Sequence, residues 1–215
     1  MSEHPVTLPA HGLPKQRPLV DVRRVVGISS FVVVGMMLLE GARAMLLGHR
    51  PVLDNTAALV EYQTNTATGM LVVITIDTFL MTALIVFLGA FRQMVTNHNR
   101  DLRWIADIAF GAGIVFVAVT LVGDAMAGGA ALDTIGTVPD PSTIRALTVG
   151  HILMFGVVGC VLTTLVMAAC GVIVLNSTLF PRWVGWAAFA CAATNMLSVP
   201  TTFLGTDPDF WASSG

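Results

Sequence analysis

The chain of 215 residues is 55% hydrophobic and only 11% charged, whereas an average soluble domain is ~25% charged. This balance predicts that most of the chain has lipid as its solvent, and it argues against a separate soluble domain. The formal net charge is −2 and the basic residues are spread along the chain, so no nucleic-acid partner is expected.

Residues 1–24 form a polar segment that contains four prolines and four basic residues, Lys15, Arg17, Arg23 and Arg24. A cleaved signal peptide would carry its apolar stretch closer to the first residue and would end it at small residues. The segment therefore predicts a disordered cytoplasmic arm.

Apolar runs long enough to cross a bilayer begin after this arm. We expect five spans, at residues 25–47, 69–91, 104–126, 144–175 and 183–204. The predicted fold is an all-α transmembrane helical bundle over residues 25–204. The fourth run must tilt or project outward, because 32 residues at a rise of ~1.5 Å exceed a hydrocarbon core of ~30 Å.

Residues 205–215 follow the fifth run and carry Asp207 and Asp209. They are expected to be an extracytoplasmic tail or the start of a connector to a sixth span beyond Gly215. A five-span protein with a short exported tail is the alternative.

Local patterns in the connectors predict where three helices begin. Asp140 fits a helix N-cap and Pro141 the first helical position, where its missing N–H costs nothing. Pro181 is expected to start the fifth span in the same way. Asn55 and its neighbours are expected to cap a short surface helix that ends near Tyr62.

Polar residues inside the spans are the candidates for function, because a carboxyl group at the bilayer centre costs at least ~2.5 kcal/mol. Counting along the helices places several of them in the middle-to-outer zone of the membrane. The sequence therefore predicts an outward-facing ligand pocket between helices, lined by Glu40, Arg43, Asp77, His151 and Asn195.

Each of these residues also has a purely structural interpretation. Glu40 and Arg43 fit a neutralising pair on one helix, or Arg43 extends outward to the interface. His151 fits a packed histidine, and Asn195 fits a hydrogen bond between helices. Asp77 has no charged neighbour on its own helix, so it is expected to face protein and to pair with Arg43 or His151.

Two further carboxylates lie near the predicted ends of the third span. Asp107 is expected to be a solvated residue at the helix start, and Asp124 is expected to lie at the outer interface. The set Glu40, Asp77, Asp124 and His151 offers metal-ligand atoms, but it lacks the helical spacing of a metal site, and no metal is expected. No cofactor is indicated.

The sequence from residue 180 onward resembles a known family. Three features show the resemblance. Residues 180–186 read Phe-Pro-Arg-Trp-Val-Gly-Trp, an alanine-rich helix follows, and residues 195–200 read Asn-Met-Leu-Ser-Val-Pro. They resemble the penultimate span of small bacterial integral membrane proteins grouped as domain of unknown function 4386, over residues 150–206. The resemblance implies a six-span bundle and assigns no activity or catalytic residue.

Three functions remain open from the sequence. The first is binding or passage of a small or amphipathic ligand through the outward-facing pocket, with proton coupling as an option. The second is a non-catalytic membrane subunit or accessory protein, in which these polar residues hold the helices together and contact other subunits. Membrane lipid is an expected partner of the protein in each case. The third is an intramembrane enzyme that uses a metal held by the same carboxylates, so an enzymatic activity is left undecided.

The basic residues predict the orientation in the membrane. Eight of them, Lys15, Arg17, Arg23, Arg24, Arg92, Arg100, Arg103 and Arg182, fall on one side, and only Arg50 and Arg145 on the other. The positive-inside rule then places the N-terminus in the cytoplasm of a multi-pass protein of the cell membrane. Single cysteines should be labelled from the cytoplasm at residues 92–103 and from outside at residues 128–139. Reversed labelling would contradict the orientation.

Overall fold

The computed structural model describes residues 21–200 apart from 49, 52, 54 and 137. All secondary structure in this part of the chain is helical, which confirms the all-α class. The elements are α1 (Val22–Leu46), α2 (Thr56–His98), η1 (Arg100–Leu102), α3 (Arg103–Leu132), α4 (Pro141–Leu153), η2 (Met154–Gly159), α5 (Cys160–Leu175) and α6 (Arg182–Ser198).

Four helical stretches in the described part are long and apolar enough to cross a membrane. They are Val22–Arg43, Thr56–His98, Arg100–Leu132 and Pro141–Leu175. The fifth expected span corresponds to α6, which has 17 residues in the described part. Its expected last residues, 201–204, the arm at 1–20 and the tail at 205–215 lie outside the described residues.

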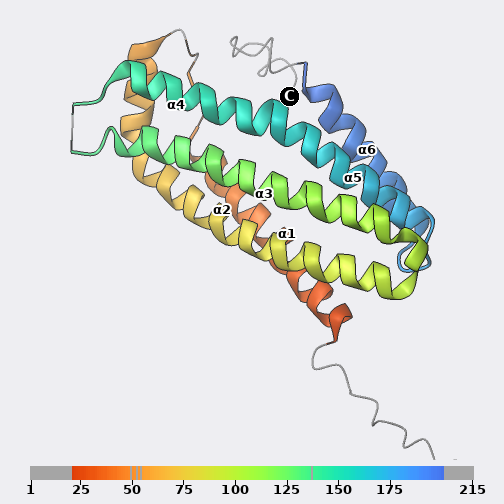
Figure 1. The fold of residues 1–215 in the computed structure, drawn as a ribbon. Coiled ribbons are helices and arrows are strands. Elements are labelled where there is room, and N and C mark those ends of the chain that lie inside the picture. The colour runs from red at the N-terminus through yellow and green to blue at the C-terminus, as the bar shows by residue number, and fades with distance from the viewer. Residues whose placement is uncertain (1–20, 49, 52, 54, 137, 201–215) are drawn as a thin grey trace, which may run out of the picture.

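Helix α2 is much longer than the expected span. It has 43 residues, which at a rise of ~1.5 Å makes it about twice as long as a hydrocarbon core is thick. Asn55 caps it by accepting a hydrogen bond from the Ala58 N–H at 3.1 Å. The prediction of a separate surface helix is wrong, because no glycine or proline interrupts the helix before Gly69. In Figure 1 the first turns of α2, in orange, lie across the ends of α3 and α4.

Helix α4 begins as expected. The Asp140 side chain accepts hydrogen bonds from the backbone N–H groups of Ser142 and Thr143, and Pro141 is the first helical residue. Hydrogen bonds from Thr143 and Ser142 hold the pKa of Asp140 below its usual range. The fourth span is not one regular α-helix, however, because the π-helical segment η2 joins α4 to α5.

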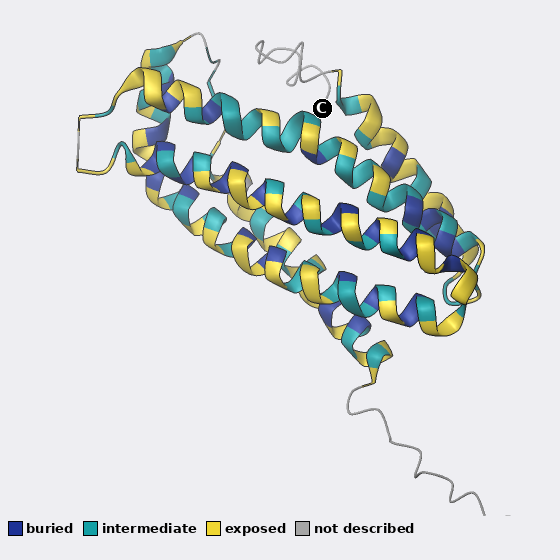
Figure 2. Ribbon diagram, in the orientation of Figure 1, coloured by how far each residue is buried: buried dark blue, intermediate teal, exposed yellow. Residues whose placement is uncertain are grey.

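The helices form a bundle in which α3 is central. It packs against α2 on one side and against α4, η2 and α5 on the other. Helix α1 packs mainly on α2, and α6 packs mainly on α5. In Figure 1, α1 runs behind α2 and α3, and α6 lies beyond α5. Figure 2 shows the buried residues concentrated where α2, α3 and α5 face one another, while α1 is largely exposed.

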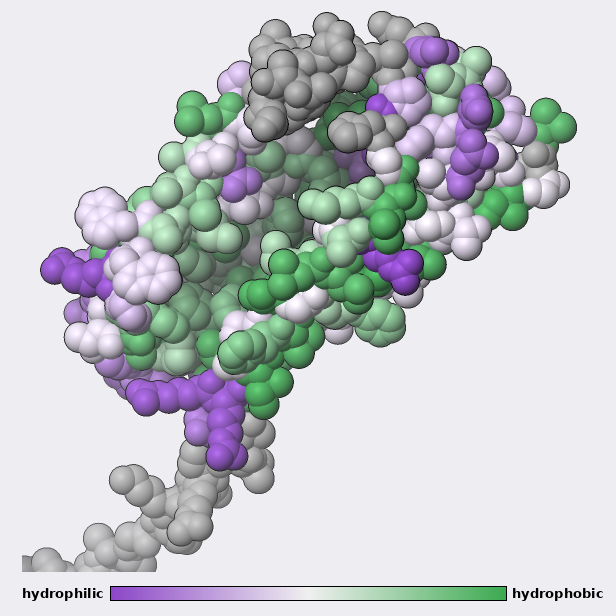
Figure 3. Space-filling model, turned by 180° about the vertical axis from the view of Figure 1, so that it is seen from behind, coloured by the Kyte–Doolittle hydropathy of each residue, from purple (hydrophilic) through white to green (hydrophobic). Residues whose placement is uncertain are grey.

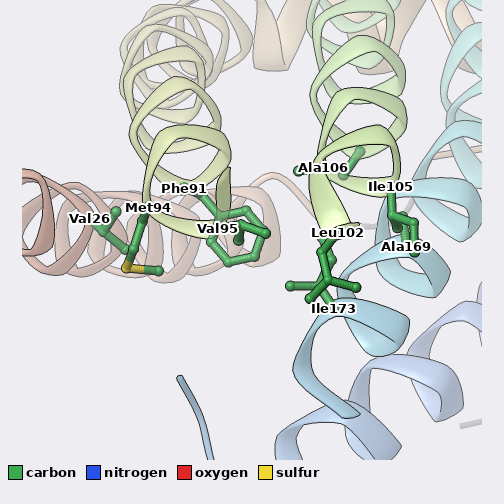
Figure 4. Packing of buried hydrophobic residues seen from close by; sticks show 10 residues of the cluster. Val26, Phe91, Met94, Val95, Leu102, Ile105, Ala106, Ala169 and Ile173 are labelled. Carbon is green, nitrogen blue, oxygen red and sulfur yellow. The ribbon is translucent and has the colours of Figure 1, made fainter. Parts of the chain in front are cut away.

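A hydrophobic cluster closes the end of the bundle at which α2 and α3 are joined. It contains Phe91 and Val95 from α2, Ile105 from α3 and Ile173 from α5, among others (Figure 4). Beside it the Asp107 carboxylate pairs with Arg92 and lies 3.9 Å from the Arg103 Nε. Asp107 is half-exposed, as expected at a helix start, but it also ties α3 to α2.

The outer faces of the bundle are strongly apolar. On α1, Phe31 is 84% exposed and Leu38 is 70% exposed. Figure 3 shows that much of the surface on this side is hydrophobic and that it is hollowed in the middle. Trp104, Trp183 and Trp186 are all exposed, which suits side chains that favour a membrane interface.

Helix α6 is held on α5 by a direct approach of two glycines. A Cβ atom on Gly171 would lie 3.2 Å from the carbonyl oxygen of Gly185, and the reverse distance is also 3.2 Å. Backbone atoms move aside less easily than a flexible side chain, so both positions favour glycine. Such small-residue contacts let helices pack closely in a membrane.

We predict that Gly185→Ala destabilises the protein by ~1–3 kcal/mol through overpacking, partly offset by a gain of ~1 kcal/mol in helix propensity. Gly111→Ala is the matched control, because a Cβ at Gly111 meets nothing within 4 Å and gains the same propensity. Thermal unfolding in detergent measures both. Equal effects of the two substitutions would contradict the close contact.

Candidate functional site

The register of α2 against α3 is fixed by two close contacts. Near one end, Ile74 of α2 lies against Gly128 of α3, and toward the other end Leu88 lies against Gly113. In both places a larger side chain of α2 occupies the space that a glycine leaves open. The two helices are therefore antiparallel with a defined pairing over four turns.

This register brings Asp77 and Asp124 to the same level. Asp77 is three residues from the first contact and eleven from the second, and Asp124 is four and eleven residues from them. The two carboxyl groups lie within hydrogen-bonding range of each other. The expectation that Asp77 faces protein is confirmed, since it is only 3% exposed, whereas Asp124 is buried at 6% and not at the interface as expected.

No protein donor reaches the Oδ2 atom of either carboxyl group within the described residues. Two neighbouring carboxylates repel each other strongly when they are removed from water. The pair is stable only when a proton or a small cation lies between the two groups. The structure thus forms a buried acid pair, Asp77 and Asp124, inside two candidate membrane spans.

Glu40 adds a third negative charge to this region. It is half-buried on the face of α1 that packs on α2, and it interacts electrostatically with both members of the acid pair. Within the described residues, no three histidine, cysteine, aspartate or glutamate side chains are arranged to hold a metal ion.

The predicted partners of Asp77 are wrong. Arg43 lies exposed on α1, and in the described part of the chain it forms no ion pair. His151 is directed to a backbone group instead of to Asp77. The neighbour of Asp77 is Asp124, and in the described part of the chain no basic side chain forms an ion pair with either carboxyl group.

His151 joins α4 to α3 beside the acid pair. Its Nδ1 lies 3.0 Å from the carbonyl oxygen of Gly123, the residue before Asp124. A carbonyl only accepts, so Nδ1 donates and Nε2 of the neutral ring is left as an acceptor. Gly123 permits this approach, because a Cβ there would lie 2.8 Å from the Phe155 ring.

The π-helical segment η2 packs at the same level. Met154 and Phe155, its first two residues, lie against Gly123, and the rings of His151 and Phe155 are 4.7 Å apart. A π-helical turn inside an α-helix is uncommon and is frequent at functional sites. The irregular turn therefore marks the level of the acid pair on a third helix.

Asn195 does not join this group. Its side chain donates to the carbonyl oxygen of Cys191 at 2.9 Å, on its own helix. Helix α6 packs mainly against α5, so Asn195 lies apart from Asp77. Of the five expected pocket residues, the structure places Glu40 near Asp77, and it places His151 against Gly123, the residue before Asp124.

A second polar region lies at the C-terminal end of α2. A surface cavity of about 610 Å³ is lined there by residues of α1 and α2 and by Leu179, including Arg23, Asn97 and His98. His98 and Thr178 are 3.2 Å apart beside it. This cavity is far along α2 from Asp77 and does not contribute to the acid pair.

Comparison of the chain with protein-family models, with curated proteins and with solved structures finds no match. The function must therefore be argued from the site itself.

We predict that Asp77→Asn and Asp124→Asn are energetically coupled. Either single substitution already removes the repulsion between the two carboxylates, so the second substitution relieves nothing further, and a double-mutant cycle should show a coupling of about 0.5–3 kcal/mol in unfolding free energy. The cycle of Asp77→Asn with Arg43→Gln should be additive within ~0.5 kcal/mol. Additivity in the Asp77/Asp124 cycle together with coupling in the Asp77/Arg43 cycle would show that Asp77 pairs with Arg43 instead.

Proposed function

We propose that the protein binds a small or amphipathic ligand between its helices and couples this binding, or the passage of the ligand, to proton uptake at the acid pair. The observation that carries the proposal is the burial of Asp77 and Asp124 against each other inside candidate spans, where no basic side chain of the described residues forms an ion pair with them. Ionisable groups in such positions are costly and mark proton or ion pathways in membrane proteins.

The surroundings of the pair support a site whose charge changes during function. Glu40 is only half-buried. Its carboxyl group therefore lies between the acid pair and the surface of the bundle on the side where α1 packs, and it can pass a proton between them. A ligand that disturbs the contact between α1 and α2 would alter the environment of Asp77 and hence its hold on a proton. This linkage is the physical basis of the proposed coupling.

We also propose five spans, with the N-terminus in the cytoplasm and α6 as the start of the fifth. The basic residues at one end of the bundle and the exposed Trp104 and Trp183 support this orientation. Membrane lipid is then the main partner of the apolar faces. The resemblance to domain of unknown function 4386 stays a prediction and adds no activity.

A membrane subunit without transport activity is the second candidate. The observation that favours it is the wide apolar face of α1, on which Phe31 and Met45 are 84% and 85% exposed. In a bilayer, lipid chains or the helix of another subunit can cover this face. Purification in a mild detergent as a stoichiometric complex with another membrane protein, lost on Phe31→Ala, would support this candidate.

Proton coupling is tested in liposomes that contain the purified protein and a pH-sensitive dye. With an imposed pH gradient, a panel of amphipathic cations and anions is added from outside. We predict that at least one compound dissipates the gradient through the wild-type protein and that the Asp77→Asn/Asp124→Asn variant lacks this response.

Glu61→Gln is the matched control, because Glu61 is a carboxylate on α2 that faces outward and is exposed. It should behave as the wild type does. A response that survives in the doubly substituted protein, or the absence of any response across the panel, would count against proton coupling.

A further inference from the structure

Arg50 is a partly buried cation outside the candidate spans, between α1 and α2. Its Nε atom is buried and has no hydrogen-bond partner among the described residues. Burial lowers the pKa of Arg50. No carboxylate in the described part of the chain forms an ion pair with it.

Among the described residues, two groups interact with Arg50, and neither is a carboxylate. Tyr62 and His151 are the residues that interact with it electrostatically. Thr148 lies one turn before His151 on α4, is 2% exposed, and has a buried Oγ1 without a partner in the described structure.

A buried guanidinium without a counter-charge is unfavourable, because the cost of removing it from water is not offset by an attraction. The planar fork of an arginine fits the oxygens of a phosphate or carboxylate and binds them through two parallel hydrogen bonds. The hydroxyl group of Tyr62, which interacts with Arg50, can donate to the same oxyanion. The missing component of this cluster is therefore an anion.

We propose that Arg50 is the main residue of an oxyanion-binding site at the end of the bundle where α2 and α4 begin, and that it binds a phosphate-type anionic group. This inference rests on the proposed function, because it names the chemical class of the ligand: a molecule with an anionic group. The group belongs either to a lipid headgroup or to a soluble phosphate compound.

The site lies on one side of the acid pair and is connected to it through His151. That histidine interacts with Arg50 and binds the carbonyl oxygen of Gly123, next to Asp124. The cation Arg50 therefore lies near the end of the bundle, and the carboxyl groups of Asp77 and Asp124 lie nearer its middle. A ligand held by its anionic group at Arg50 keeps that group away from the repelling acid pair.

The full-length protein in detergent micelles tests the site. Its melting temperature is measured with rising inorganic phosphate at constant ionic strength, and separately in micelles that contain phosphatidylglycerol or phosphatidylcholine. Stabilisation by phosphate and phosphatidylglycerol indicates a site for either source. Stabilisation by phosphatidylglycerol alone indicates a lipid headgroup, and stabilisation by phosphate alone a soluble anion.

Arg50→Gln should raise the half-saturating concentration of the anion at least ~tenfold, because a charge-assisted hydrogen bond is lost. It should still fold, since it removes a buried charge. Arg50→Lys keeps the charge but not the fork and should weaken binding by a smaller factor. Arg43→Gln, an exposed arginine, is the control and should bind as the wild type does.

No stabilisation by either anion, or equal weakening by Arg50→Gln and Arg43→Gln, would overturn the proposal. Asp77→Asn should retain the response to phosphate. A failure of proton coupling would therefore leave this result intact, and the two proposals can fail separately.

Discussion

The structure depends on one constraint: two carboxyl groups that approach each other away from water need a proton or cation between them. Asp77 and Asp124 are brought together by the packing of α2 on α3, in which glycines of α3 receive larger side chains of α2. The same contacts that stabilise the helix pair thus impose an electrostatic cost at its middle. A sequence under selection for stability alone would place apolar residues there.

Other features of the bundle lie at the level of this constraint. Gly123 lets α4 approach α3, His151 binds its carbonyl oxygen, and the π-helical turn begins three residues later at Met154. Glu40 approaches from α1. The polar and irregular features of four helices therefore gather at one height, while α6 takes no part and is held on α5 by glycine packing.

Much of the fold could be predicted from the sequence, because a bilayer admits few structures. The all-helical class, the start of α4 at Pro141 and the burial of Asp77 followed from hydropathy, capping residues and the cost of a membrane carboxylate. The length of α2 did not, because its first turns contain polar residues that hydropathy assigns to a connector. No glycine or proline lies between Thr56 and Gly69, and this was the signal that the helix begins well before the apolar run.

The partner of Asp77 was missed for a related reason. Asp77 lies 21 residues before His98, and Asp124 lies 21 residues after Arg103, the ends of the hairpin that joins α2 and α3. The expected second span ended at residue 91 and the expected third span began at residue 104. Asp77 and Asp124 were then at different distances from the hairpin, and Asp124 was placed at the interface because it lies two residues from the expected end of its span. Contacts between helices, such as those of Ile74 and Leu88, come from side-chain shape and cannot be derived from hydropathy.

The most direct test of the account is infrared spectroscopy of the purified protein near neutral pH. A carboxyl group that holds a proton shows a C=O stretching band that ionised carboxylates lack. The account predicts this band in the wild-type protein, a shift of the band in D₂O, and its loss when Asp77 and Asp124 are both replaced by asparagine. A wild-type spectrum without a protonated carboxyl, in a protein free of bound cations, would contradict the central claim.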